Sequence, residues 1–262
     1  MRNLSHIWSN KQKIKSLSKL VITMCNKVNE QEQNKNSEQR KQREQREQYE
    51  QGEYKEQCKQ SEQLAEEITK LEWDQFQFTH NEGGRANCQG NWSTFHIMRM
   101  SQFLAWPREL QESYKQDLEI ANKENRNLIT EKYARMMEST APDIFERTIK
   151  PYIKPILDPQ KSDQEQIIRT QVAWAADFRE RYPHLGLHMR VLRTSEDTEE
   201  NTSFETYLRG ELSTYSNATF AKYQRFVEKL QSQNLNLTQI IILNTVRMYG
   251  YDSLDSAERA QQ

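Results

Sequence analysis

The sequence predicts an all-α protein whose residues 64–262 fold as a single domain of six or seven helices. From Leu64 onward, apolar side chains recur at steps of three and four, which is the spacing of one helix face. Glycine is rare, with 7 in 262 residues, and there are only 6 prolines. The one stretch that alternates like a strand is "GLHMRVLR", residues 186–193. A lone strand has no partner, so we predict an extended loop there.

The expected helices follow from these apolar stripes in chain order. Asn91 is a good cap for the second helix, and Thr202 with Glu205 has the pattern of a capping box. Pro142 suits the first turn of a helix, and Gly250 suits a helix end. The expected ranges are about 62–80, 92–105, 108–120, 125–139 and 162–181. Further apolar stripes lie in "TSFETYLRGEL", residues 202–212, and over 220–230 and 237–246.

Residues 1–29 form a separate basic zone, because no acidic residue precedes Glu30. Two interpretations are open. The zone is either an amphipathic helix that lies on anionic lipid, or an accessory helix or upstream sequence, and the second is preferred. The apolar residues that define its helical face are Ile14, Leu17, Val21, Met24 and Val28.

Residues 30–63 are of low complexity and consist mainly of Gln, Glu, Lys and Arg. Their only apolar or semi-apolar side chains are Tyr49, Tyr54 and Cys58, so the segment cannot bury enough surface to offset its chain entropy. The apolar a and d positions of a coiled coil are absent. We therefore expect a charged tether, either a solvated single helix or a disordered segment.

Bulk composition excludes several classes of partner. The net charge of −1 gives no general attraction to nucleic acid or to acidic lipid. The three cysteines are widely spaced and form neither a disulfide framework nor a metal knuckle, which suits a reducing, cytoplasmic compartment. No apolar run reaches the ~20 residues that span a bilayer.

Four stretches resemble a known bacterial family, domain of unknown function 4125, over about residues 64–258. The resemblance implies an intracellular bacterial protein without an assigned activity, and it implies a nucleotidyltransferase-like protein as a partner. It does not reach the first 63 residues. The stretches are "EWDQFQ", "NEGGRANCQGNWSTFHIMRMSQF", "NLITEKYARMMESTAP" and "TSFETYLRGELSTYS".

The stretch "NEGGRANCQGNW", residues 81–92, concentrates three of the glycines. One interpretation is a turn between two helices, in which Gly83 or Gly84 ends the first helix. The other is an anion site, because two glycines let a ligand approach the backbone and Arg85 adds five donors beside them. The sequence fits neither a P-loop nor a dinucleotide fingerprint.

The functional hypothesis is that charged residues of three stretches meet in a cleft between helices. Gly83, Gly84, Arg85, Arg135, Tyr207 and Arg209 would bind the ligand, and Glu205 and Glu138 would act as acid, base or orienting groups. Cys88 as a nucleophile and a His80–Cys88–His96 metal site are both weak alternatives, so we expect neither a metal nor another cofactor.

Two functions therefore follow from the sequence. The first is a cytoplasmic protein that binds a small anionic or nucleotide-like ligand in an inter-helix cleft, and the residues leave open whether it is an enzyme. The second is a non-catalytic interaction or scaffold module that docks through its N-terminal helix. A shared concave pocket for the charged residues would favour the first, and an apolar groove with scattered ion pairs would favour the second.

Overall fold

The computed structural model describes residues 43, 46, 49, 52, 53, 55–79, 87–153, 155–198 and 201–262. The chain divides into two units, residues 1–59 and residues 60–262. Where it is described, the first unit is helical, and the hydroxyl of Tyr49 donates to Glu53 Oε1 at 2.8 Å. The predicted basic helix over 1–29 lies outside the described residues.

The second unit is all-α, which confirms the predicted fold class. It begins with a helical segment over residues 60–77, called the entry helix below. Short 3-10 and π turns join some of the later elements. The α-helices are α2 (Trp92–Phe103), α3 (Arg108–Lys123), α4 (Leu128–Thr140), α5 (Pro142–Ile144), α6 (Asp158–Arg181), α7 (Pro183–Gly186), α8 (Phe204–Leu212), α9 (Asn217–Ser232), α10 (Leu237–Met248) and α11 (Leu254–Ala260).

The predicted number of six or seven helices was too low. The additional helices are short: α5, α7 and α11 have 3, 4 and 7 residues, too few for a periodic apolar pattern to appear. Residues 186–193 contain no strand, as predicted. Their backbone instead accepts hydrogen bonds from the start of α8, from Phe204 N to Val191 O at 2.8 Å and from Glu205 N to Leu192 O at 3.1 Å.

Side-chain caps fix where most helices begin. Asn91 caps α2 as predicted, because its Oδ1 accepts the backbone N–H of Thr94 at 3.1 Å. The capping box predicted for α8 is wrong by one residue. Ser203 rather than Thr202 is the cap, and the carboxylate of Glu205 accepts from the backbone of Thr194 instead.

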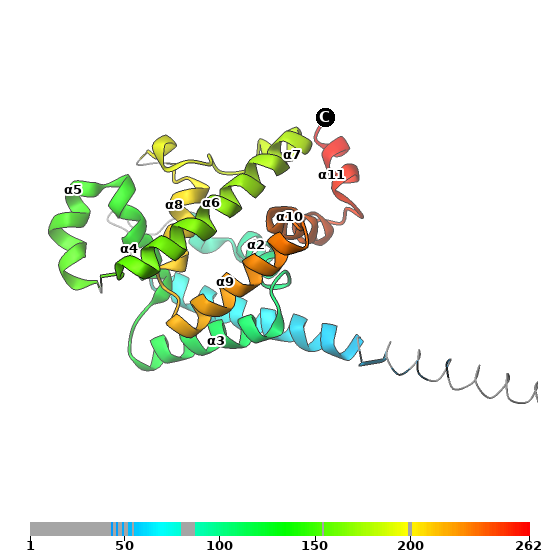
Figure 1. Ribbon diagram of the computed structural model, residues 1–262, viewed down its shortest axis with the longest axis horizontal. Helices are drawn as coiled ribbons and strands as arrows, with labels where there is room; N and C mark the ends of the chain where they lie inside the picture. Colours follow the sequence, from blue (N-terminus) through cyan, green and yellow to red (C-terminus); the bar gives the residue numbers. More distant parts are fainter. Residues whose placement is uncertain are drawn as a thin grey trace, which may run out of the picture. The chain divides into compact units, whose positions relative to one another are not determined.

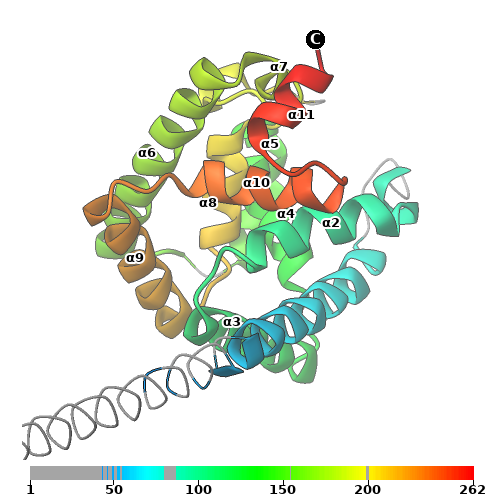
Figure 2. The ribbon, with the colours of Figure 1, turned by 90° about the vertical axis from the view of Figure 1, so that its right-hand side faces the viewer.

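The helices surround one main hydrophobic core. Figure 2 shows α8 near the middle of the domain, with α6 and α9 on one side and α2 and the entry helix on the other. α8 packs against α4 and α6, and α10 packs against α2 and α6 (Figure 1). Aromatic rings fill the centre, and they include Phe103, Trp106, Tyr114, Tyr215 and Tyr223.

A smaller apolar cluster joins the end of α6 to the last two helices. It contains Phe178 of α6, Val246 of α10 and Leu254 of α11. The carboxylate of Glu258 holds α7 in place, since it accepts the backbone N–H groups of His184 and Leu185 at 2.8 and 2.9 Å. Among the described residues, no helix combines the length and apolar character needed to cross a membrane.

The closest approach of α4 and α8 depends on Gly210. A β-carbon at this position would lie 2.8 Å from Met136 Cγ and 2.9 Å from the backbone oxygen of Lys132. The backbone contact cannot be relieved by turning a side chain. Only glycine therefore allows α8 to lie this close to α4.

We expect Gly210→Ala to destabilise the domain by about 1–2 kcal/mol. Overpacking lowers the unfolding free energy by about 1–3 kcal/mol, whereas replacing a helical glycine by alanine raises it by up to about 1 kcal/mol. Chemical denaturation measures the change. Gly90→Ala is the matched control, because a β-carbon there meets nothing within 4 Å. Equal stability of the two variants would contradict this role of Gly210.

Candidate functional site

A buried ion pair joins the entry helix to α2. Arg99 of α2 donates through Nη2 to Glu72 Oε1 at 2.6 Å, and through Nε to the other carboxylate oxygen. The pair is bidentate, which is the strongest geometry available to these two side chains. Only 7% of the Arg99 side chain and 0% of the Glu72 side chain are exposed.

Glu211 of α8 extends this pair to two more helices. Its Oε2 lies 3.3 Å from Arg99 Nη1 and 3.6 Å from Lys132 Nζ of α4. Its Oε1 accepts from Gln102 Nε2 at 2.7 Å and from the hydroxyl of Tyr215 at 3.1 Å. Glu72, Arg99, Lys132 and Glu211 are called the buried charge network below.

Two further tyrosines complete the polar contacts of the buried charge network. Tyr114 donates its hydroxyl to Glu72 Oε1 at 2.7 Å. Lys132 Nζ donates to the hydroxyl of Tyr207 at 2.8 Å, and it lies 4.5 Å from the centre of the Tyr207 ring. With two carboxylates and two cations the network is neutral, as buried charges must be to avoid a large desolvation cost.

The pKa shifts of Glu211 and Lys132 favour the charged forms of these two groups. Burial alone would raise the pKa of Glu211, but Arg99 and Lys132 outweigh it and lower this pKa to about 2. Burial would lower the pKa of Lys132, but Tyr207 and Glu211 raise it above its usual value. A general acid or base needs a pKa near the working pH. The shifts run away from neutrality, so this geometry is that of a structural network.

A signal in the sequence could have located the buried charge network. Each charged residue stands four positions from an apolar or aromatic residue on either side, so it interrupts an apolar helical stripe. Each also comes from a different one of the four stretches that carry the family resemblance. The flanking residues are Ile68 and Phe76 around Glu72, Phe95 and Phe103 around Arg99, Leu128 and Met136 around Lys132, and Tyr207 and Tyr215 around Glu211.

Of the site residues predicted from the sequence, Arg209 and Glu205 form the expected i,i+4 ion pair on α8, at 3.1 Å. Arg209 also binds both carboxylate oxygens of Glu165 of α6, at 2.6 and 3.0 Å, and its Nη1 donates to Thr194 Oγ1. Hydrogen bonding to Glu165, against the opposing effect of burial, raises the pKa of Arg209. The Arg209 guanidinium therefore joins α8 to α6.

The remaining predicted residues are distributed over α4 and α8. Tyr207 lies beside Lys132, and the guanidinium of Arg190 covers its ring at 4.8 Å. Arg135 stands on α4, and burial lowers its pKa, while Glu138 is exposed on the same helix. α4, which carries Arg135 and Glu138, packs against α8, which carries Tyr207.

Gly83, Gly84 and Arg85 lie outside the described residues, so the convergence of Arg85 with Arg135 and Arg209 stays a prediction. His80 also lies outside this part, and nothing is described of the Cys88 side chain. Within the described residues no three His, Cys, Asp or Glu side chains are grouped as a metal site.

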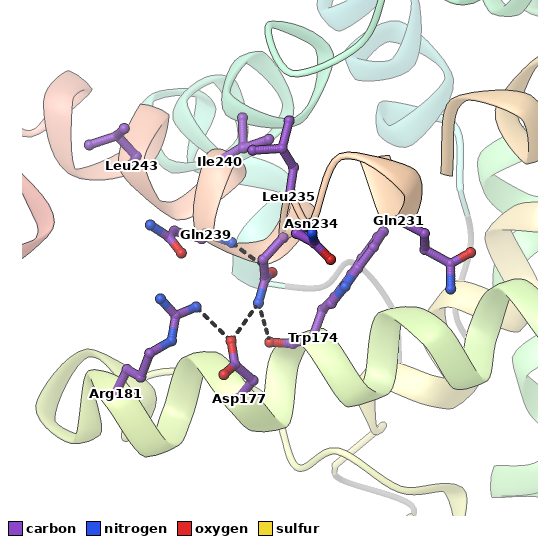
Figure 3. A pocket seen from close by; sticks show the side chains of 10 residues that line it. Trp174, Asp177, Arg181, Gln231, Asn234, Leu235, Gln239, Ile240 and Leu243 are labelled. Carbon is purple, nitrogen blue, oxygen red and sulfur yellow. Dashed lines mark hydrogen bonds and ion pairs between the residues drawn. The ribbon is translucent and has the colours of Figure 1, made fainter. Parts of the chain in front are cut away.

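A pocket of about 740 Å³ lies between α6 and the connection from α9 to α10 (Figure 3). None of the predicted site residues that the structure describes lines it. Its walls combine one indole and three aliphatic side chains with amides and one Asp–Arg pair. The lining residues are Trp174, Asp177, Arg181, Gln231, Asn234, Leu235, Asn236, Gln239, Ile240 and Leu243.

Asn236 fixes the geometry of this pocket. As the cap of α10 it accepts the backbone N–H of Gln239 at 3.2 Å. Its Nδ2 donates to the backbone oxygen of Trp174 and to Asp177 Oδ2, both at 2.9 Å. Arg181 Nη2 donates to the same oxygen of Asp177 at 2.6 Å (Figure 3). One side chain thus ties the start of α10 to the middle of α6.

Several polar groups of the pocket remain available to a ligand. The side-chain amides of Asn234 and Gln239 form no hydrogen bond with any described residue, and neither does Asp177 Oδ1. The Arg181 side chain is 42% exposed and uses Nη2 for Asp177. The volume of the pocket lies within the range of small-molecule sites.

The fold and site together define an all-helical domain with a buried, neutral charge network and an inter-helix pocket. Residues 62–259 match a family described as protein of unknown function (DUF4125), and the chain belongs to this family. Comparison with curated proteins and with solved structures gave no match.

We expect the low pKa of Glu211 to make the unfolding free energy of the domain depend on pH in the acidic range. Between pH of about 4.5 and about 2 the unfolded chain binds a proton at Glu211 and the folded protein does not, so the unfolding free energy falls as the pH falls. The stabilisation is complete above this range. Denaturant titrations over this range should show a steeper loss for the wild type than for Glu211→Gln.

Glu112→Gln is the control for this experiment, because it removes a carboxylate from an exposed ion pair, with Arg108. It should keep the wild-type pH dependence. If Glu211→Gln loses stability with pH as steeply as the wild type, Glu211 is not held charged by its neighbours.

Proposed function

We propose that this domain binds a small organic anion in the pocket between α6, α9 and α10. The observation that carries the proposal is an inter-helix pocket of about 740 Å³ in which the exposed guanidinium of Arg181 adjoins apolar walls and unpaired amides. A guanidinium presents five donors in a fixed fork that matches a phosphate or a carboxylate. The apolar walls would contact the remainder of the ligand.

Binding rather than catalysis is the better supported activity. The pKa values of Glu211 and Lys132 are shifted away from neutrality, and the carboxylate that lines the pocket, Asp177, already accepts from Asn236 and Arg181. We propose a cytoplasmic location in a bacterium, which the widely spaced cysteines and the family resemblance support.

The alternative, a non-catalytic interaction module, also has a supporting observation. Ion pairs such as Arg108–Glu112 and Arg126–Glu131 are scattered over separate surfaces. Leu235, at 43% exposed, and the half-buried Ile240 and Leu243 give the pocket an apolar side. The ligand screen below separates the two functions.

In a thermal-shift screen of phosphorylated and carboxylated metabolites, we expect at least one compound to raise the Tm of the wild type. A ligand at 100 times its Kd stabilises the folded state by about 2.7 kcal/mol, which is roughly 5–10 °C for a domain of this size. Arg181→Ala should lose most of this shift. Arg169→Ala, which removes an exposed arginine of α6 outside the pocket, should keep it.

If no compound stabilises the wild type, the small-ligand function is wrong and the interaction module is favoured. If Arg181→Ala responds as the wild type does, the ligand binds elsewhere.

A further inference from the structure

The pocket has two unlike walls. Trp174 of α6, half-buried, forms part of one wall, and Leu235, Ile240 and Leu243 lie on the side of α10 (Figure 3). A pocket lined by an indole and aliphatic side chains favours an apolar face of a ligand over a bulky polar group. Stacking on an indole is a contact available to every heteroaromatic ring, because each has a π-face.

Three side chains of α6 define an order along the pocket. Trp174, Asp177 and Arg181 follow one another at steps of three and four, so they share one face of the helix. Trp174 and Arg181 are separated by two turns, about 10 Å along the axis. The face therefore presents an aromatic ring, then a hydrogen-bond acceptor, then a cation.

This order matches the parts of a nucleotide. A base would stack on Trp174, the sugar hydroxyls would donate to the free Oδ1 of Asp177, and the phosphate would meet the nitrogens of Arg181 that Asp177 does not use. Carboxylates bind ribose hydroxyls in this way in other nucleotide sites.

The unpaired amides fit the same ligand. Asn234 and Gln239 each carry a donor pair and an acceptor without a partner among the described residues. Base edges display both donors and acceptors, which amides can read in either sense. The backbone at Asn234 has a φ of 53°, a left-handed conformation that asparagine tolerates well.

From these contacts we infer that the pocket between α6, α9 and α10 is a nucleotide site, with the base on Trp174 and the phosphate at Arg181. This inference rests on the proposed small-anion function and specifies its ligand.

The test is isothermal titration with adenosine, guanosine, cytidine and uridine 5′-monophosphates, the four nucleosides, ribose 5-phosphate and inorganic phosphate. At least one nucleotide should bind about 5- to 100-fold more tightly than ribose 5-phosphate, which is the range for one base stacked on an aromatic ring. Trp174→Leu should remove this advantage, and Trp174→Phe should keep most of it.

Arg181→Ala should bring the nucleotide close to the affinity of its nucleoside, a loss of about tenfold or more. Arg169→Ala is the control. Circular dichroism and Tm without ligand show that each variant is folded, since Trp174 also packs against the main core.

Three results overturn the inference. The first is ribose 5-phosphate binding as tightly as every nucleotide, and the second is an unchanged nucleotide affinity in Trp174→Leu. Both leave the proposed anion site standing. The third is the absence of binding by all of these probes, in which case the wider metabolite screen decides the proposed function separately.

Discussion

The bidentate contact of Arg99 with Glu72 is the interaction on which the rest of the domain depends. Removing two charges from water is expensive, and only close pairing with further hydrogen bonds offsets the cost. Glu211 and Lys132 supply the second pair, while Gln102, Tyr114 and Tyr215 supply hydrogen bonds. Since these groups come from four different helical segments, satisfying them requires the entry helix, α2, α4 and α8 to meet in one arrangement.

The pocket follows from that arrangement through α6. Gly210 lets α8 approach α4 closely, and Arg209, its neighbour, binds Glu165 and so joins α8 to α6. α6 then receives the start of α10 through the cap residue Asn236. A chain of contacts thus runs from the buried charge network to the pocket between α6, α9 and α10.

The sequence predicts the helices of this domain well but does not indicate the pocket between α6, α9 and α10, for a physical reason. The stripe of Leu110, Tyr114 and Leu118 indicates α3 directly, and all three side chains are buried. Helix periodicity is local, and local patterns can be seen in the sequence. The pocket depends on Trp174 and Leu235, which are brought together by packing between helices, and no spacing along the chain indicates such a contact.

The buried charge network can be predicted from the sequence only in part. Each of its four members is a charged residue within the apolar stripe of its helix, and the sequence shows this interruption directly. Their pairing is not visible, because Glu72 and Glu211 lie far apart in the sequence. The predicted cleft around Arg209 stays a prediction; the guanidinium of Arg209 binds Glu165 and Glu205.

A double-mutant cycle on Glu72 and Arg99 tests the central claim most directly. The unfolding free energies of Glu72→Leu, Arg99→Met and the double variant should be measured at neutral pH. Each single change removes the bidentate contact and leaves the buried charges unbalanced, so it should cost about 3–5 kcal/mol. The double variant should be more stable than the sum of the two losses by about 2 kcal/mol or more. Simple additivity of the two losses would contradict the account.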